Sequence, residues 1–167
     1  DEAFRHLATG RPQPVHVEIP LDVLDEPAQF SGRAPSQQPA PVEPSPEIVD
    51  DAVQRLLAAQ RPLIYCGGGA ISANASEAIT RLWKPGNAID DLVRDADLMI
   101  VFGSKLGVQA THDFALPLAA ELIRVDIDPR ELSLNARPSV PILADARRTA
   151  EALVERLAAL PPRSHPA

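Results

Sequence analysis

The sequence predicts an α/β fold in which a parallel, doubly wound sheet follows a proline-rich linker. Short, almost wholly apolar runs, of which residues 62–66 and 97–103 are the clearest, have the composition of strands covered on both faces. Segments with the apolar spacing of helices separate these runs, and strands that alternate with helices indicate a parallel sheet. Six prolines, set among Ser, Gln, Gly and Ala from Asp25 to Pro46, mark the linker.

The composition limits the classes of function. The 167 residues suffice for one ordinary domain, and 45% hydrophobic with 23% charged residues is typical of a soluble globular protein. The formal net charge of -7 and the lack of a lysine or arginine run argue against nucleic acid as a partner. The apolar stretches are too short to cross a bilayer, so we expect no membrane partner. A single cysteine, Cys66, and the lack of a secretory leader predict a cytoplasmic protein without an internal disulfide.

Two patterns precede the linker. Residues 1–9 have the composition of the end of a helix, which Gly10 stops. Residues 15–19 (VHVEI) alternate apolar and polar side chains, which is the period of a strand with one buried face. The proline-rich stretch 25–46 cannot bury enough apolar surface to offset its ordering entropy. We therefore predict that residues 1–24 belong to an upstream domain and do not pack into the domain after the linker.

The main domain is expected over residues 47–160, with 161–167 as a linker or tail. Ser45 is placed to cap its first helix, which has Pro46 in its first turn. We expect helices on both faces of the sheet. In chain order, the further elements are a strand at 62–66, helices at 74–83 and 88–95, a strand at 97–103, a helix at 113–120, strands at 121–128 and 139–144, and a last helix that Asp145 caps and that runs through Leu157.

Five motifs carry a resemblance to a known family. They are residues 10–23 (GRPQPVHVEIPLDV), 61–70 (RPLIYCGGGA), 96–104 (ADLMIVFGS), 125–129 (VDIDP) and 142–146 (ILADA). In this order they resemble the thiamine-diphosphate-dependent decarboxylases and carboligases, such as acetolactate synthase, pyruvate oxidase, glyoxylate carboligase and oxalyl-CoA decarboxylase. The resemblance extends over almost the whole chain.

The resemblance implies that residues 1–24 end a pyrimidine-binding domain and that residues 47–160 are a Rossmann-like central domain of the FAD/NAD-binding type. The parent enzyme is then a transferase or lyase that acts on 2-oxo acids with thiamine diphosphate and Mg2+. The family binds these in its pyrimidine- and diphosphate-binding domains, which would be the partners of this chain, within a homo-oligomer. The resemblance therefore implies no catalytic or metal-binding residue in this chain, which is expected to be inactive by itself.

One unit of the family pattern is missing. Between the helices at 74–83 and 88–95 the family carries a further strand, helix and strand, whereas here RLWKPGNAID (81–90) joins the two helices directly. About 30 residues or more, roughly one βαβ unit, are absent. In a sheet of order 3-2-1-4-5-6 the absent strands 2 and 3 lie at one edge, so strands 1-4-5-6 remain contiguous. Strand 62–66 then becomes an apolar edge strand.

Two loops supply most of the candidate cofactor-binding residues. The loop at 67–69 follows a buried strand, where a doubly wound sheet brings its backbone close to a phosphate, although a tight turn needs glycine equally. In flavin-using relatives this loop lies along the dinucleotide, and the loop that matches 103–105 runs near the flavin phosphates. Lys105 would supply charge there, unless it is merely solvated. The candidate residues are Gly67, Gly68, Gly69, Gly103, Ser104, Lys105, Asp126 and Asp145.

The acidic candidates follow two later strands. Asp126 ends a predicted strand at the edge where ligands bind, and its carboxylate is suited to accept hydrogen bonds from ribose hydroxyls. Asp128, which precedes Pro129, is expected to form an Asx turn instead. Asp145 is a helix cap first and a ligand contact second. The four histidines share no metal-ligand spacing, and Cys66 is expected to be a buried small apolar residue.

The identity of a bound nucleotide stays open. FAD, ADP or no ligand all agree with the resemblance, and ADP needs less of the site, because the Gly-rich stretch that lines the flavin in relatives falls in the missing unit. Two other classes of function are a free-standing NAD-dependent deacylase-like or dehydrogenase domain and a pure interaction module. The first lacks a histidine in a catalytic context and zinc-binding cysteine pairs. The second predicts no nucleotide affinity.

Overall fold

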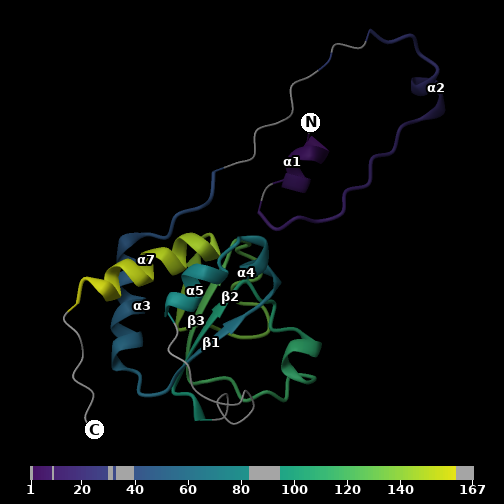
Figure 1. Ribbon diagram of the computed structural model, residues 1–167. Helices are drawn as coiled ribbons and strands as arrows, with labels where there is room; N and C mark the ends of the chain where they lie inside the picture. Colours follow the sequence, from purple (N-terminus) through teal and green to yellow (C-terminus); the bar gives the residue numbers. More distant parts are fainter. Residues whose placement is uncertain (1, 9, 30–31, 33–39, 83–94, 161–167) are drawn as a thin grey trace. The chain divides into compact units, whose positions relative to one another are not determined.

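The computed structural model describes residues 2–8, 10–29, 32, 40–82 and 95–160 (Figure 1). The chain divides into two compact units, Asp1–Ala40 and Pro41–Ala167. The second unit contains the sheet and its helices.

The first unit contains two short helices, α1 (Glu2–Ala8) and α2 (Leu21–Leu24). The helix expected at 1–9 is therefore present. Residues 15–19, predicted as a strand, form none, because a strand needs a neighbouring strand and the described part of this unit offers no such neighbour. The apolar side chains of this segment consequently remain unburied, and Val17 is 60% exposed.

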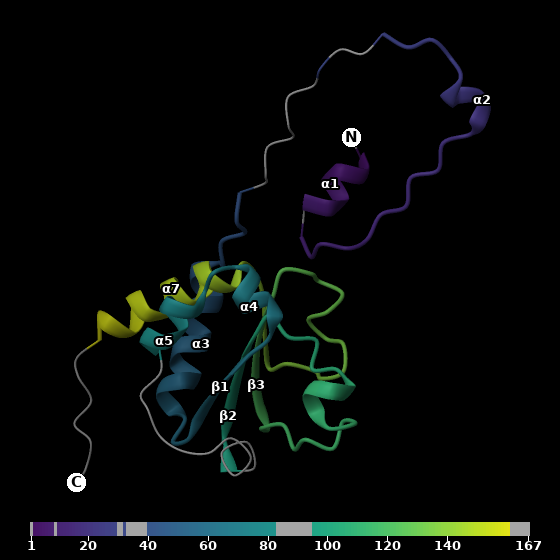
Figure 2. The ribbon, with the colours of Figure 1, turned by 45° about the vertical axis from the view of Figure 1, so that its right-hand side comes forward.

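The second unit is built on four parallel strands: β1 (Pro62–Cys66), β2 (Leu98–Phe102), β3 (Glu121–Asp126) and β4 (Val140–Leu143). Their order in the sheet is β1-β2-β3-β4, which is also their order in the chain. Figure 2 shows the first three of them side by side. Pro62 lies opposite Leu98, and Leu98 lies opposite Glu121. The predicted parallel α/β sheet, with strand 62–66 paired to 98–102, is thus confirmed. Pro141 in the edge strand β4 has no amide N–H, as is usual for proline at a sheet edge.

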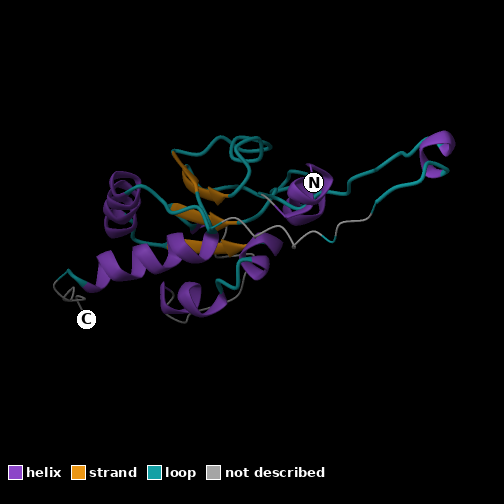
Figure 3. Ribbon diagram, turned by 90° about the horizontal axis from the view of Figure 1, so that it is seen from above, coloured by secondary structure: helices purple, strands orange, loops and turns teal. Residues whose placement is uncertain are grey.

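A layer of α-helices covers one face of the sheet (Figure 3). It consists of α3 (Pro46–Ala58), α4 (Gly68–Ser72), α5 (Ser76–Leu82) and α7 (Ala146–Ala158). These helices pack on the side chains of alternate strand residues, among them Ile100, Phe102 and Val125, all fully buried. Burial of this continuous apolar face supplies the main driving force for folding of the unit.

The two long helices begin at the predicted caps. The Ser45 hydroxyl accepts a hydrogen bond from the Ile48 amide at 3.4 Å, and Pro46 is the first residue of α3. The Asp145 carboxylate accepts the amides of Arg147 and Arg148 at 2.9 and 3.0 Å, which fixes the start of α7.

The opposite face of the sheet is covered differently. A smaller apolar cluster around Met99, Val101 and Leu122 is covered by side chains of the loop at 116–119, and the described residues of this cluster include none from an α-helix. The 3-10 helix η1 (Val108–Thr111) is joined to this face by the Tyr65 hydroxyl, which donates to the carbonyl oxygen of Ala110 at 3.2 Å. The helix predicted at 113–120 was wrong. His112, Asp113 and Phe114 all have positive φ angles, of 48°, 57° and 64°, which a right-handed helix excludes.

Two further predictions need correction or lie outside the described part of the chain. The helix predicted at 74–83 begins only at Ser76, because Asn74 has a left-handed φ of 53°, and the short helix α4 before it was not predicted. The helix predicted at 88–95 falls, except for Asp95, outside the described residues.

The end of the proline-rich segment is part of the second unit. The carbonyl oxygen of Val42 accepts a hydrogen bond from the Asp145 amide at 2.8 Å. Next to it, the Glu43 carboxylate lies 3.2 Å from Nε of Arg148. The residues that lead into α3 are therefore anchored at the beginning of α7.

The packing of α7 yields a prediction about stability. Leu153 is fully buried on the helix face of the sheet, whereas Leu160, just after the helix, is 39% exposed. We expect Leu153→Ala to lower the free energy of unfolding by about 2–5 kcal/mol, because it removes buried apolar atoms and leaves a cavity. Leu160→Ala, the matched control, should change it by less than about 1 kcal/mol. Urea denaturation followed by circular dichroism measures both, and equal losses would contradict the packing described.

Candidate functional site

The candidate residues all lie at the carboxyl ends of the four strands. Residues 67–69 follow β1, residues 103–105 follow β2, Asp126 ends β3, and Asp145 follows β4 by two residues. Parallel strands end at the same edge of the sheet, which is why residues so far apart in the sequence meet here.

Gly68 and Gly69, predicted to lie in a loop, are instead the first residues of α4, and this helix start is in direct backbone contact with the loop after β2. The Gly69 amide donates to the carbonyl oxygen of Gly103 at 2.9 Å. A Cβ atom on Gly67 would lie 2.5 Å from that same oxygen, and one on Gly69 would lie 2.8 Å from the Gly103 Cα. Gly103 itself has a φ of +56°, and a Cβ there would lie 2.6 Å from the Gly69 Cα. These three glycines therefore allow the start of α4 to pack closely on the loop after β2, and protein atoms fill the space beside them.

Gly68 differs from its neighbours. It is exposed, and a Cβ atom there would meet nothing within 4 Å. Of the three glycines predicted to approach a phosphate, Gly68 is thus the one whose Cα faces open space.

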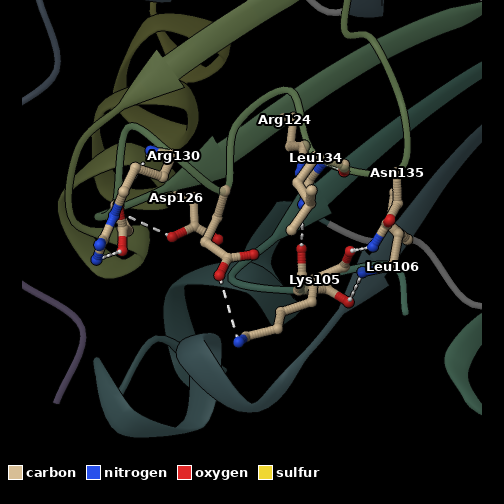
Figure 4. A network of polar contacts seen from close by, with 10 residues as sticks. Lys105, Leu106, Arg124, Asp126, Arg130, Leu134 and Asn135 are labelled. Atoms are coloured by element: carbon tan, nitrogen blue, oxygen red, sulfur yellow. Dashed lines mark hydrogen bonds and ion pairs between the residues drawn. The ribbon is translucent and has the colours of Figure 1, made fainter. Parts of the chain in front are cut away.

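A buried arginine holds the loops after β2 and β3 together (Figure 4). Arg124, in the middle of β3, is fully buried, and its guanidinium donates to the carbonyl oxygens of Ser104, at 2.9 Å, and Leu134. The Asn135 side-chain amide adds a bond to the carbonyl oxygen of Lys105 at 3.0 Å. Sequence reasoning missed Arg124, although a charged residue inside the apolar run ELIRVDID was the signal that could have identified it.

Ser104 and Lys105 have partners within the protein. The Ser104 hydroxyl accepts the Leu106 amide at 3.2 Å, and the residue is buried. The Lys105 ammonium lies 3.3 Å from a carboxylate oxygen of Glu131, a residue that the sequence analysis did not select. The Lys105 side chain is 53% exposed and that of Glu131 10%.

Asp126 and Asp128 form two successive turns. Oδ1 of Asp126 accepts the Asp128 amide at 3.0 Å, and Oδ1 of Asp128 accepts the Arg130 amide at 3.0 Å. The Arg130 guanidinium also binds Oδ2 of Asp128 at 2.8 Å, and this carboxylate raises the pKa of Arg130. The Asx turn predicted at Asp128 is confirmed. Among the described residues Oδ2 of Asp126 has no hydrogen-bond partner, and only 5% of the surface of Asp126 is exposed.

Cys66 and Asp145 lie near the same edge and have different surroundings. Cys66 is exposed at the end of β1 rather than buried as expected, because β1 is an edge strand, and the partial burial of its thiol raises its pKa. Asp145 is engaged as the cap of α7. Across the described ranges, no three His, Cys, Asp or Glu side chains are placed to hold a metal ion. No helix within the same ranges has the length and apolar character needed to traverse a bilayer.

Comparison with known sequences points to one family. The family described as "Thiamine pyrophosphate enzyme, central domain" matches residues 84–153. The chain is 35% identical to "Probable 2-ketoarginine decarboxylase AruI" of Pseudomonas aeruginosa, over 93% of this chain and 33% of that protein. It is 31% identical to the acetolactate synthase large subunit of Corynebacterium glutamicum, over 92% of this chain and 30% of that protein.

Solved structures share the fold. An enzyme from Mycobacterium smegmatis assigned to the thiamin diphosphate-dependent enzymes superposes with a TM-score of 0.70 at 20% identity, over 92% of this chain and 36% of that one. Benzoylformate decarboxylase from Polynucleobacter necessarius gives a TM-score of 0.61 at 17% identity, over 81% of this chain and 31% of that one.

The lengths of the matches are informative. The chain spans about a third of the length of these curated relatives. The alignment to the Pseudomonas protein extends over 185 positions, whereas 93% of 167 residues is about 155. About 30 positions of that relative thus have no counterpart in this chain. This number is close to the size of one βαβ unit, which the resemblance to the family predicts to be absent.

The contact between the start of α4 and the loop after β2 yields a second prediction. We expect Gly103→Ala to lower the free energy of unfolding by about 2 kcal/mol or more, because the new Cβ meets backbone atoms and φ is positive. Gly107→Ala is the matched control, since a Cβ at Gly107 meets nothing within 4 Å. It should change the free energy by less than about 1 kcal/mol. Thermal denaturation compares the two, and a tolerated Gly103→Ala would refute the close packing.

The buried arginine yields a third prediction. We expect Arg124→Met to destabilise the protein by about 2–4 kcal/mol, because the carbonyl oxygens of Ser104 and Leu134 lose their donor inside the protein. Arg156→Met is the control; Arg156 lies 2.6 Å from Asp50 but is 45% exposed, so its loss should cost about 1 kcal/mol or less. Guanidinium denaturation measures both variants. A cost for Arg124→Met no greater than for Arg156→Met would show that Arg124 does not hold the loops.

Proposed function

The chain belongs to the family of thiamine-pyrophosphate-dependent enzymes and contains their central domain, and from this premise we propose that it is the structural centre of a carboligase or decarboxylase of 2-oxo acids. The names of two relatives, a 2-ketoarginine decarboxylase and an acetolactate synthase, support this range of reactions. The catalytic work then falls to other domains of the parent protein. We further propose that this parent is a cytoplasmic homo-oligomer.

The observation that carries the structural role is the self-contained carboxyl edge of the sheet. Arg124 joins two of its loops through their carbonyl oxygens, and the glycines at 67, 69 and 103 hold the start of α4 against the loop after β2 by backbone contact. The cations of the same edge, Arg130 and Lys105, face carboxylates of the chain itself. An edge whose segments are joined by internal contacts in this way suits a domain that spaces and orients its neighbours.

The first unit supports the presence of an upstream domain. Residues 15–19 have the pattern of a strand, but their apolar side chains are exposed in the described structure. A sheet in a preceding pyrimidine-binding domain would pair with their backbone and bury Val15, Val17 and Ile19. We propose residues 1–24 as the last part of that domain.

The described residues fit the implied cofactors to different degrees. The described residues include no group of three His, Cys, Asp or Glu side chains placed to hold a metal ion. From the family resemblance we propose that thiamine diphosphate and Mg2+ bind in other domains of the parent protein. A flavin dinucleotide fits poorly, because the space beside Gly67 and Gly69 is filled by the loop at Gly103. ADP fits in part, since Oδ2 of Asp126 can accept a hydrogen bond from a ribose hydroxyl. Weak ADP binding is therefore the second candidate function.

The coding sequence around this chain tests the main proposal. We expect the reading frame to continue upstream into a pyrimidine-binding domain with a catalytic glutamate and downstream into a domain with the GDG…N motif of the family. The extended protein should release carbon dioxide from a 2-oxo acid when thiamine diphosphate and Mg2+ are present, and the 167-residue chain alone should not. Stop codons on both sides, or activity of the chain alone, would contradict the proposal.

Calorimetric titration with ADP, FAD and NAD tests the nucleotide-binding candidate. We expect weak ADP binding or none at millimolar concentration, and no binding of FAD or NAD. If ADP binds, Asp126→Ala should weaken it by a factor of about 10 to more than 100, as expected for a lost charged hydrogen bond. Asp128→Ala is the control, because it should loosen the turn without changing the affinity. Binding of NAD alone, or ADP affinity that Asp126→Ala leaves unchanged, would contradict this candidate.

A further inference from the structure

We propose that Glu131 competes with phosphate for Lys105. Its carboxylate forms an ion pair with the Lys105 ammonium and so keeps the carboxyl edge of the sheet from binding a nucleoside diphosphate. The inference rests on the proposed function, since it concerns the same edge and the same ligand class. It identifies the residue that decides between a structural domain and a nucleotide-binding one.

The backbone around Lys105 is fixed, so its side chain alone can change partners. Its carbonyl oxygen accepts the Asn135 side-chain amide at 3.0 Å. The preceding residue, Ser104, is held through its carbonyl oxygen by Arg124 and through its hydroxyl by the Leu106 amide. Figure 4 shows Lys105 reaching from this loop toward the same edge on which Asp126 lies.

The two members of the ion pair differ in freedom. The Glu131 amide donates to the carbonyl oxygen of Asp128 at 3.0 Å, and the Glu131 side chain is 10% exposed, so its carboxylate is held inside the edge. Lys105, at 53% exposure, faces solvent. A dissolved phosphate must therefore displace a carboxylate that is tethered beside the ammonium and has a high effective concentration.

The charges of the polar network around Lys105 explain why Glu131 can determine whether a phosphate is attracted to it. The network of Figure 4 contains equal numbers of acids and bases, so its formal charge is zero, and a diphosphate gains no net attraction from it. Neutralising Glu131 would leave this network with an excess positive charge at Lys105. The acids of this network are Asp126, Asp128 and Glu131, and its bases are Lys105, Arg124 and Arg130.

The test is calorimetric titration of the full 167-residue chain and of Glu131→Gln with ADP and with inorganic pyrophosphate. We expect Glu131→Gln to bind ADP about tenfold more tightly than the unchanged chain, because Lys105 is released to form a charge-assisted hydrogen bond. The double variant Glu131→Gln with Lys105→Met should lose this gain. Glu121→Gln is the matched control, since it removes a carboxylate that binds Arg55 at the opposite end of β3 and should leave ADP binding unchanged.

Circular dichroism confirms that each variant is folded. Should Glu131→Gln fail to fold, Glu131→Asp, whose carboxylate is one methylene shorter, should give a smaller gain in the same direction. Unchanged ADP affinity in the folded Glu131 variant would overturn the inference, as would a gain that persists without Lys105. Pyrophosphate binding as tight as that of ADP would overturn the assignment to a nucleotide. None of these results touches the proposed structural role, which depends on the flanking coding sequence and the activity of the extended protein.

Discussion

The organisation of the main domain depends on one buried cation. Arg124 lies in the central part of the sheet, where a charge is costly unless its donors are satisfied. It is retained there because its guanidinium reaches the carbonyl oxygens of Ser104 and Leu134, which belong to loops that follow two different strands. These loops have no regular structure of their own, so backbone groups within them need partners from elsewhere. One side chain thereby converts two irregular segments into a fixed surface.

The contact between Gly69 and Gly103 connects a further strand end to the segments that Arg124 joins. Gly69 and Gly103 bring the start of α4, which follows β1, and the loop after β2 together at backbone distance, and Arg124 binds the loop after β2 to the one after β3. Three neighbouring strand ends are thus joined in sequence. The carboxyl edge has an acidic residue at the end of β3, a position at which doubly wound sheets can bind ligands, but internal contacts take up most of its polar groups. A scaffold and a binding site can therefore share one geometry and differ only in which partner satisfies the polar atoms.

Sequence reasoning predicted what depends on local pattern and missed what depends on distant neighbours. The strands at 62–66 and 98–102 were identified because runs of apolar residues fit a strand covered on both sides, and the caps Ser45 and Asp145 because capping is local. Residues 15–19 carry an equally clear pattern but lack a pairing strand in the described structure. The left-handed turn after η1 and the role of Arg124 have no local signature, because backbone conformation and loop partners are set by the assembled sheet. At the site, the turn at Asp128 was predictable, whereas the pairing of Lys105 with Glu131 required the fold.

The two edge strands, β1 and β4, differ in how readily a further strand can be added beside them. β4 ends the sheet with a strand that contains Pro141, whose missing N–H discourages a further strand beside it. β1, at the other edge, has no proline after its first residue and no charged residue to prevent pairing. Strands can therefore be gained or lost at the β1 side without disturbing the remaining ladder. Length variation among homologous domains should accumulate on that side, as insertions and deletions of whole βαβ units, while the β4 side stays constant.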